Sequence, residues 1–372
     1  MLIQQVDLFP LYYPLAEPYG DANGYKGYRT CFLIQIRTQS GLEGWGECVD
    51  WLPTLEKGFR QRIIPFLLGK KATDRTHLIS TIQRWHNRSA TAVSMALTEI
   101  LARHANCSVC DLWGGRLRKH VPVYASFQSY TERPDWISHS LQQVDQIIST
   151  GFTAIKVKVG GKPFQEDQQH ISRMLRLLDG QIKLAIDANQ SYDPATALKW
   201  NSLFRQYDQW LWFEEPLPFN HLSAYAFLRS RSDIPVAGGE NKQQPLDFLT
   251  LMQKELLDII QPDPMHLGGI EAYRDTLQLA RHHGVRVSPH TYDGFLARWY
   301  AILAHCCLPA WSKMAGEEME PVEWDVMTNP FQSLLSVRPV NGLVTIPEGS
   351  GIGVEWDLER LESLLWDGTP YA

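Results

Sequence analysis

The stretch LAIDAN at residues 184–189 ends an apolar run with a carboxylate, and the runs WLWFEEPL at 210–217 and IPVAGGEN at 234–241 repeat this arrangement. The three carboxylates, Asp187, Glu214 and Glu240, follow one another at intervals of 27 and 26 residues. Such an interval holds one strand, one helix and two loops. In a barrel of parallel strands the carboxyl ends of all strands open onto one face. The sequence therefore predicts an α/β barrel with three carboxylates on one face.

These three side chains offer only oxygen donors, which are the ligands that hard divalent cations prefer. A single Asp after a strand is more often the N-cap of the next helix. Their recurrence in phase favours one metal site over three separate caps. We therefore expect Asp187, Glu214 and Glu240 to bind Mg²⁺.

The same phase continues upstream in FTAIKVKVGG at 152–161, which places Lys156 and Lys158 on the same side of one strand. Buried lysines are rare unless they have a charge partner or a chemical task. Downstream, Asp263 follows Glu240 by 23 residues, and His290 follows Asp263 by 27. A hydrogen bond between Asp263 and His290 would fix the tautomer of the imidazole and raise its basicity.

The ordered set of motifs resembles the enolase superfamily, and within it the mandelate racemase group. The motifs are KVK at 156–158, DAN at 187–189, EEP at 214–216, GGEN at 238–241, QPD at 261–263 and His290. The resemblance implies a modified (β/α)7β barrel with an N-terminal α+β capping domain. It also implies that Lys158 is an acid/base with Lys156 beside it, that Asp263 and His290 form a dyad, and that Asp187, Glu214 and Glu240 bind the metal.

In this group a Glu on the eighth strand donates a proton to the substrate carboxylate. The corresponding region of this chain offers four glutamates: Glu317, Glu318, Glu320 and Glu323. We expect Glu323 because it lies within the apolar segment PVEW at 321–324. If none of the four faces the barrel, the charge of the intermediate rests on the metal and Lys156.

Three segments are expected along the chain: a capping domain at 1–118, the barrel at 119–340 and a C-terminal segment at 341–372 that returns to the cap. The cap begins with alternating strands, has turns at the glycines of GLEGWGE at 41–47, and continues as helices over about 55–108. VPVYAS at 121–126 is the expected first barrel strand, and the eighth is expected near MEPVEW at 319–324.

Composition excludes several classes of partner. The net charge is −6 and no basic run is present, which argues against nucleic acid. No run approaches the ~18 apolar residues of a membrane span, and no signal peptide is recognised, so we expect a cytoplasmic protein.

The six cysteines, including the CxxC of Cys107 and Cys110, are expected to be free thiols. The 13 Trp, 14 Tyr and 14 Phe favour a homo-oligomer.

The expected chemistry is removal of the proton next to a carboxylate, with the metal and Lys156 stabilising the enediolate. Lys158, beside another ammonium and a metal, should have a lowered pKa and act as a base, with His290 approaching from the other side. Two bases permit dehydration of an acid sugar, or racemisation or epimerisation of a 2-hydroxy acid. A non-catalytic barrel that binds a sugar acid or serves in an assembly is the third alternative.

Substrate contacts are expected in two cap loops, 16–30 and 47–55, which the family closes over the barrel mouth. They are rich in polar groups and lack the apolar lining that an aryl acid requires. An aldonate or aldarate that loses water to give a 2-keto-3-deoxy acid fits best. The expected substrate-binding residues are Tyr19, Lys26, Arg29, Trp51 and Asn189.

Overall fold

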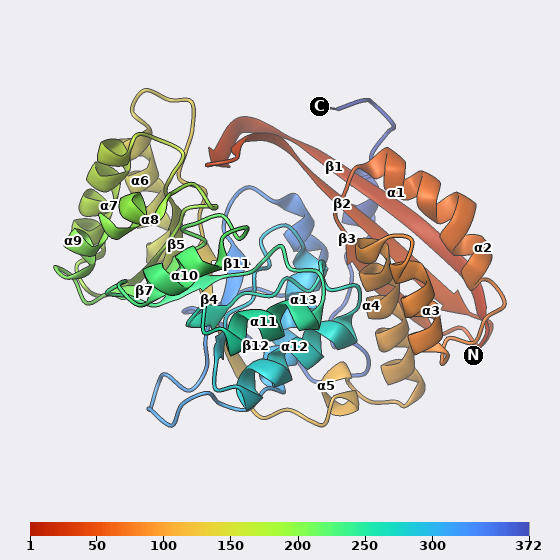
Figure 1. Ribbon diagram of the computed structural model, residues 1–372. Helices are drawn as coiled ribbons and strands as arrows, with labels where there is room; N and C mark the ends of the chain where they lie inside the picture. The colour runs from red at the N-terminus through yellow and green to blue at the C-terminus, as the bar shows by residue number, and fades with distance from the viewer. Residues whose placement is uncertain (372) are drawn as a thin grey trace.

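An antiparallel sheet of three strands forms the N-terminal part of the computed structural model, which describes residues 1–371. Its strands, in spatial order, are β1 (Ile3–Asp21), β2 (Gly24–Thr38) and β3 (Glu43–Cys48). Helices lie against this sheet at the right of Figure 1. They are α1 (Leu52–Gly58), the π-helical turn η1 (Phe59–Ile63), α2 (Ile64–Leu67), α3 (Arg75–Gln83) and α4 (Asn87–His104). The short helix α5 (Val109–Leu112) follows and contacts α4 and α13.

The segment expected as a loop at 16–30 is instead the end of a long β-hairpin, and that expectation is wrong. β1 and β2 remain paired as far as Asp21 and Gly24, so only Ala22 and Asn23 form the turn. The hairpin end is also tied to the barrel, because the Gly20 amide donates to the Tyr130 carbonyl at 2.9 Å. In Figure 1 the hairpin extends from the cap across the barrel. The turn is therefore held above the barrel mouth.

Gly44 and Gly46, expected in turns, lie within β3. A Cβ atom at Gly46 would lie 1.8 Å from the Ala92 carbonyl oxygen, and one at Gly44 would lie 2.1 Å from that of Ala96. Both carbonyls belong to α4. The two glycines therefore permit the close approach of α4 to the strand.

Eight parallel strands form the barrel sheet, which confirms the predicted fold class, and each predicted barrel run overlaps one of them. In spatial order they are β11 (Val322–Asp325), β4 (His120–Ser126), β5 (Ala154–Lys158), β6 (Lys183–Asp187), β7 (Trp210–Glu214), β8 (Val236–Gly238), β9 (Ile259–Ile260) and β10 (Arg286–Val287). The central runs are apolar because barrel strands are covered on both faces. The sheet's order brings the ends of the strands to one mouth.

β10 and β11 close the barrel without a strand ladder among the described residues. Side chains bridge the gap instead. Ser288 Oγ donates to the Pro321 carbonyl at 2.6 Å, the Val287 amide donates to Glu320 at 2.7 Å, and Thr291 Oγ1 donates to the Glu323 carbonyl at 2.8 Å. We call this line between β10 and β11 the seam.

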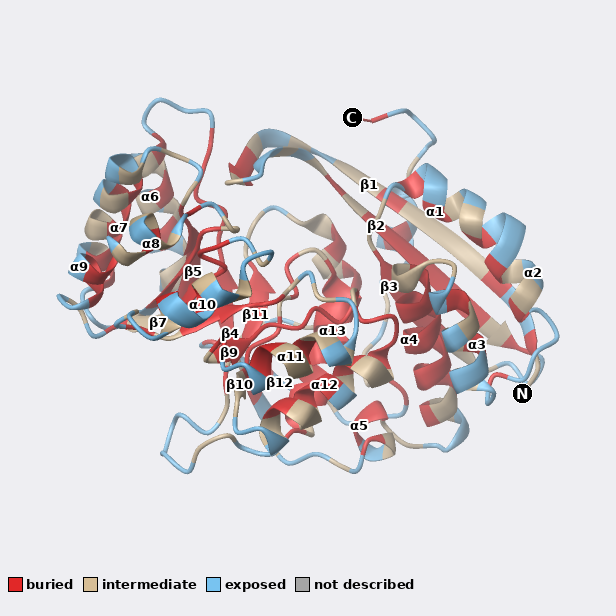
Figure 2. Cartoon of the chain, in the orientation of Figure 1, coloured by how far each residue is buried: buried red, intermediate tan, exposed pale blue. Residues whose placement is uncertain are grey.

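Helices cover the outside of the barrel, with buried faces toward the strands and exposed faces outward (Figure 2). They are α6 (Trp136–Ser149), α7 (Phe164–Leu178), α8 (Pro194–Leu198), α9 (Asn201–Phe204), α10 (Leu222–Arg229), α11 (Pro245–Gln253), α12 (Ile270–His282) and α13 (Phe295–Cys306). α13 differs from the others because all of its residues are buried. Such a helix is covered on every side, here by the barrel and the cap.

The 3₁₀ turn η2 (Pro330–Leu334) precedes the C-terminal segment. The segment itself contains β12 (Leu343–Thr345), which pairs with β4, and α14 (Leu358–Ser363). Its end lies against the cap, since the Leu52 amide donates to the Tyr371 hydroxyl at 2.9 Å and the Trp366 amide donates to the Pro10 carbonyl at 2.8 Å.

All six cysteines are free thiols, as predicted. Within residues 1–371, no helix combines the length and apolarity needed to cross a membrane.

Glu47 joins the cap to the barrel. Its buried carboxylate accepts the amides of Phe295, Leu296 and Ala297, at 3.2, 2.8 and 2.8 Å, at the beginning of α13. These amides have no partner within the helix, so the carboxylate satisfies groups that would otherwise be buried and unpaired.

Glu47→Ala should therefore lower the free energy of unfolding by about 3 kcal/mol, because three buried donors lose their acceptor. Denaturant titration measures this change. Glu47→Gln keeps one acceptor oxygen and should lose less. Glu43→Ala, a half-exposed position on the same strand whose ion pair with Arg37 lies at the surface, should change stability by less than about 1 kcal/mol. Equal stability of Glu47→Ala and wild type would contradict a role for Glu47 in joining the two parts.

Candidate active site

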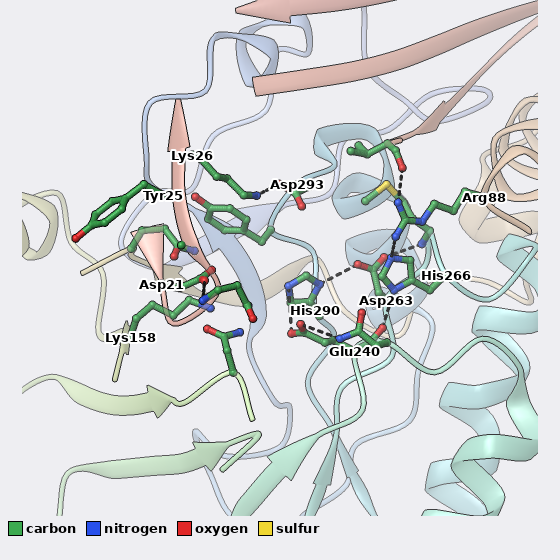
Figure 3. Close-up of a pocket in the computed structure, with 18 residues that line it drawn as sticks. Asp21, Tyr25, Lys26, Arg88, Lys158, Glu240, Asp263, His266, His290 and Asp293 are labelled. Carbon is green, nitrogen blue, oxygen red and sulfur yellow. Dashed lines mark hydrogen bonds and ion pairs between the residues drawn. The ribbon is translucent and has the colours of Figure 1, made fainter. Parts of the chain in front are cut away.

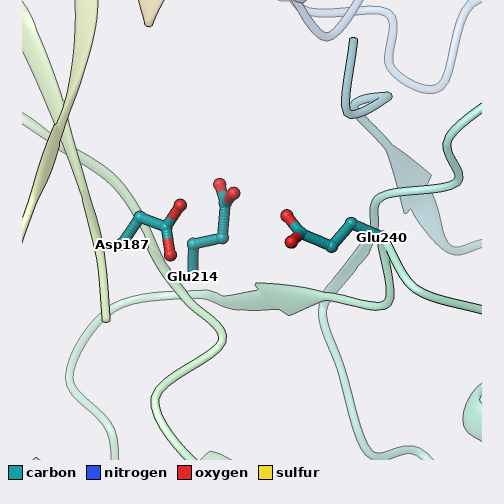
Figure 4. A group of neighbouring side chains, drawn as sticks. All are labelled: Asp187, Glu214 and Glu240. Carbon is teal, nitrogen blue, oxygen red and sulfur yellow. The ribbon is translucent and has the colours of Figure 1, made fainter. Parts of the chain in front are cut away.

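The three carboxylates of the repeating motif converge at the barrel mouth (Figure 4). Asp187 and Glu214 are the last residues of β6 and β7, and Glu240 lies two residues beyond β8. One oxygen of each lies within 4.8 Å of the others. Asp187 and Glu214 are fully buried, and Glu240 is partly exposed. The arrangement gives a hard divalent cation three anionic oxygen ligands and an open side.

Two lysines and a fourth carboxylate surround this cluster. Lys156 Nζ lies 3.3 Å from Asp187, 2.9 Å from Glu323 and in short contact with Glu214, while Lys158 Nζ lies 2.6 Å from Asp187. Carboxylates therefore outnumber ammonium groups by two, counting Glu240. Burial raises the pKa of Glu214 to about 7 despite the attraction of Lys156. A divalent cation would balance this excess, so the residues fit a metal such as Mg²⁺.

The pKa of Lys158 is raised, the opposite of the sequence expectation. Burial favours the neutral amine, but the Asp187 carboxylate at 2.6 Å outweighs both burial and the repulsion of Lys156. The same pairing lowers the pKa of Asp187 although burial acts to raise it. The expectation considered the like charge beside Lys158 but not this direct ion pair.

His290 lies past the end of β10 and is oriented by Asp263. Its Nδ1 lies 2.8 Å from Asp263, whose other oxygen accepts the Met265 amide at 2.7 Å. Its Nε2 lies 3.4 Å from Glu240 and 3.8 Å from Glu323. Burial opposes the charged imidazole, but Glu240, Glu323 and the bond with Asp263 together raise the pKa of His290. The sequence-predicted dyad is therefore present, with Nε2 turned toward the carboxylate cluster.

Of the four glutamates considered for the eighth strand, Glu323 faces the barrel interior. It is fully buried and also accepts the Thr291 amide at 2.6 Å. Glu317 and Glu318 are exposed, and Glu320 pairs with Arg281 away from the cluster. Burial acts to raise the pKa of Glu323, yet Lys156 and His290 outweigh it and lower that pKa. Glu323 is therefore an ionised partner of Lys156 in this structure.

A cavity of about 330 Å³ opens at the mouth, between the barrel and the end of the cap hairpin (Figure 3). Its size is within the usual range for small-molecule sites. Lys158, Glu240, Asp263 and His290 line it, together with the predicted substrate contacts Lys26 and Asn189.

The other three predicted contacts do not line this cavity. Arg29 is buried and pairs with Asp325 at 2.7 Å and with Asp293 at 3.3 Å, so it connects the cap to the barrel. Tyr19 is also buried, with its ring 5.6 Å from the Arg29 guanidinium. Trp51 packs on Tyr371 with ring centroids 4.4 Å apart.

Two family models match most of the chain. The mandelate racemase / muconate lactonizing enzyme N-terminal domain matches residues 5–114, and the enolase C-terminal domain-like model matches residues 139–361. The chain belongs to the mandelate racemase / muconate lactonizing enzyme family of the enolase superfamily.

Relatives within this family share the whole length of the chain. D-galactarolactone cycloisomerase of Agrobacterium fabrum is 30% identical over 375 residues, covering 97% of this chain and 98% of its own. L-talarate/galactarate dehydratase of Salmonella typhimurium is 26% identical over 94% of this chain and 88% of its own. The crystal structure of the dehydratase, liganded with Mg and L-lyxarohydroxamate, has a TM-score of 0.83 at 23% identity and covers 98% of this chain and 93% of that chain.

Several cavity residues of this family member were not predicted from sequence: Arg88, Gln128, Asn241 and His266. Arg88 lies at the beginning of a cap helix, where an arginine is unremarkable in sequence. His266 follows Asp263 by three residues, but its position depends on a loop turn. Only Asn241, within GGEN, lies in a motif that the sequence already singled out.

Gln261 of the QPD motif orients one carboxylate of the cluster. Its Nε2 donates to Glu214 Oε2 at 2.7 Å, and Trp212 Nε1 donates to the same oxygen at 2.8 Å. These bonds fix the carboxylate orientation and leave Oε1 toward Lys156.

Gln261→Leu should weaken Mg²⁺ binding by about 10- to 100-fold, because partners that orient a metal ligand commonly contribute this much. Activity titrated against Mg²⁺ measures the change, and added Mg²⁺ should restore most of the turnover. Gln253→Leu, at the end of α11 on the outside of the barrel, is a control that should leave the titration unchanged. An unaltered Mg²⁺ dependence in Gln261→Leu would show that Gln261 does not support the site.

Proposed function

We propose that the chain removes the proton next to the carboxylate of an acid sugar and expels the oxygen on the following carbon, with Mg²⁺ as cofactor. The observation that carries this proposal is that Lys158 and His290 line one cavity although they come from β5 and the end of β10. Four strands, β6 to β9, separate these two in the sheet. The two proton-transfer groups therefore face the cavity from different sides.

The α-proton is a weak acid because its removal adds a second negative charge to a group that already carries one. Asp187, Glu214 and Glu240 would hold Mg²⁺, which when bound supplies positive charge that stabilises the enediolate more than the starting carboxylate. Lys156, held between Glu214 and Glu323, would place a further positive charge near the same oxygens.

Lys158 Nζ would accept the α-proton as the neutral amine, a form that becomes accessible once Asp187 is committed to the metal instead of to the ion pair at 2.6 Å. The bond from the β-carbon to its oxygen would break as the carbon–carbon double bond forms. His290 Nε2 would donate a proton to the departing oxygen, because Asp263 holds the opposite ring nitrogen and supports the imidazolium. An aldonate or aldarate would thereby lose water. Tautomerisation of the enol product gives a 2-keto-3-deoxy acid.

A second substrate form is favoured by the 30% identity to a protein named D-galactarolactone cycloisomerase. If the β-oxygen belongs to a lactone ring, the same proton transfers break the ring bond and release a carboxylate instead of water. The enol product again becomes a keto acid. Dehydration and ring opening therefore require the same residues and differ only in the leaving group.

Incubation with a library of acid sugars and their lactones, followed by a ketone-specific reagent and mass spectrometry, tests the proposal. A keto product lighter than its substrate by one water establishes dehydration, and a keto product of unchanged mass from a lactone establishes ring opening. Deuterium uptake from D₂O at the α-carbon without a keto product would instead establish the racemase or epimerase. Neither product nor exchange across the library would refute the proposal.

A further inference from the structure

A second cavity, of about 460 Å³, adjoins the one that holds the proton-transfer groups. The two cavities share three lining residues: Arg88, Asn241 and His266. The remaining residues of the second cavity come mainly from the beginning of α4 and the segment before it, together with Asp50. Arg88 therefore lies in the wall between the two cavities and faces both.

Among the described residues, Arg88 differs from the other basic side chains of the first cavity, Lys26 and Lys158, in its partners. Lys26 lies 2.8 Å from Asp293 and Lys158 lies 2.6 Å from Asp187, so each has a short carboxylate contact. Arg88 donates at 2.7 Å to the Val49 carbonyl and at 3.0 Å to His266 Nε2, which are both neutral acceptors. Its nearest carboxylate, Asp50, is 3.6 Å away and also faces His86.

His266 fixes this guanidinium relative to the carboxylate cluster. Because Arg88 can only donate, His266 Nε2 must accept, and the ring proton therefore lies on Nδ1. Nδ1 then donates to the backbone carbonyl of Glu240 at 2.8 Å. A chain of hydrogen bonds thus runs from Glu240 through His266 to Arg88. Figure 3 shows Arg88 and Lys158 at opposite sides of the cavity, with His290 between them.

We infer that Arg88 binds a second carboxylate at the far end of the substrate, so that the chain acts on dicarboxylic acid sugars or their lactones in preference to monocarboxylic ones. The inference rests on the proposed function and narrows its substrate class. A guanidinium held by two neutral acceptors, with a third of its side chain exposed, keeps N–H groups free for a charge-assisted bond to a carboxylate. A terminal hydroxyl would leave the guanidinium with the more distant Asp50, at 3.6 Å, as its charged partner.

The test compares acid sugars that differ only at C6, such as galactarate and galactonate, with the Mg²⁺-loaded protein. Wild type should favour the dicarboxylate in kcat/KM by at least about 10-fold. Arg88→Met should lower the dicarboxylate value by about 10- to 100-fold, the loss of one hydrogen bond to a charged group, and change the monocarboxylate value by less than about 3-fold. Arg88→Lys should recover part of the preference. Arg84→Met, an exposed cap position outside both cavities, should leave the preference intact.

Calorimetric binding of the same pair to the Mg²⁺-loaded Lys158→Ala variant, with and without Arg88→Met, gives a readout that does not require turnover. If wild type makes no keto acid but Arg88→Met selectively weakens dicarboxylate binding, the proposed function fails and the inference stands. Keto-acid formation with equal preference for both substrates would overturn the inference alone. The inference would also be overturned if Arg88→Met lost kcat/KM equally for both substrates. If Arg88→Met does not fold, an unchanged preference for the dicarboxylate in Arg88→Lys would overturn it.

Discussion

Replacing Asp187 by Asn should lower kcat by at least about 10³-fold while the protein remains folded. The change removes one anionic metal ligand and the carboxylate that pairs with Lys158 at 2.6 Å. Loss of a single group that stabilises a developing negative charge commonly costs about 10²- to 10³-fold, and this residue also positions the base. Steady-state turnover of the substrate found by the library screen measures the loss, and circular dichroism verifies the fold.

Chelation gives an independent measurement of the same site. Dialysis against a chelator should abolish turnover, and Mg²⁺ should restore it in wild type but not in Asp187→Asn. Glu317→Gln is the matched control, because Glu317 is an exposed carboxylate whose partner is Lys183. It should keep full activity. Undiminished turnover of the chelated wild type would refute a metal-dependent mechanism.

The second large effect concerns the two proton-transfer groups. Each can exchange only the proton on its own side of the α-carbon, so deuterium uptake from D₂O distinguishes them. In a dehydratase, Lys158→Ala should stop both α-exchange and dehydration. His290→Asn should lower dehydration by about 10²- to 10⁴-fold, the usual contribution of a general acid or base, while α-exchange by Lys158 continues.

In a racemase or epimerase, both variants would lose inversion, yet each would still exchange the proton of one enantiomer. Proton NMR of the α-position follows exchange, and the keto-acid assay follows dehydration. His139→Asn, a histidine of α6 far from the cavity lining, serves as the control for His290→Asn. Full exchange of both enantiomers by a Lys158→Ala/His290→Asn double variant would mean that neither residue is the base.

The barrel was predictable because its signals are local and repeat. Each strand is an apolar run, and the chemistry follows at the same end of every run, so even the short eighth strand, β11, was found from PVEW. The regular spacing of Asp187, Glu214 and Glu240, one at the end of each strand, also predicted that the three carboxylates would lie close together. The choice of Glu323 needed only its place within an apolar segment, since buried strand residues alternate between two faces.

Features that depend on distant contacts were not predictable. The hairpin at 16–30 contains Gly and Pro residues that suggest a loop, but pairing with Tyr130, more than a hundred residues away, keeps it extended. The raised pKa of Lys158 depends on the distance to one oxygen of Asp187. Lys26 and Arg29 both pair with Asp293, yet only Lys26 lines the cavity, because Arg29 also pairs with the buried Asp325 at 2.7 Å.

We expect the seam between β10 and β11 to yield more readily than the paired strands, because no strand ladder joins its two sides among the described residues. Elsewhere, widening the barrel would break the hydrogen bonds of a strand pair, whereas here it needs only a few side chains to yield. His290 lies on the β10 side of the seam and Glu323 on the β11 side, and Thr291 forms hydrogen bonds across it. Breathing of the barrel along the seam would therefore change the reach of His290 toward the substrate while the metal ligands on β6 to β8 stay fixed. In the proposed mechanism, the paired strands β6 to β8 would hold the metal-binding carboxylates in place, and the less constrained edge at the seam would carry the proton donor.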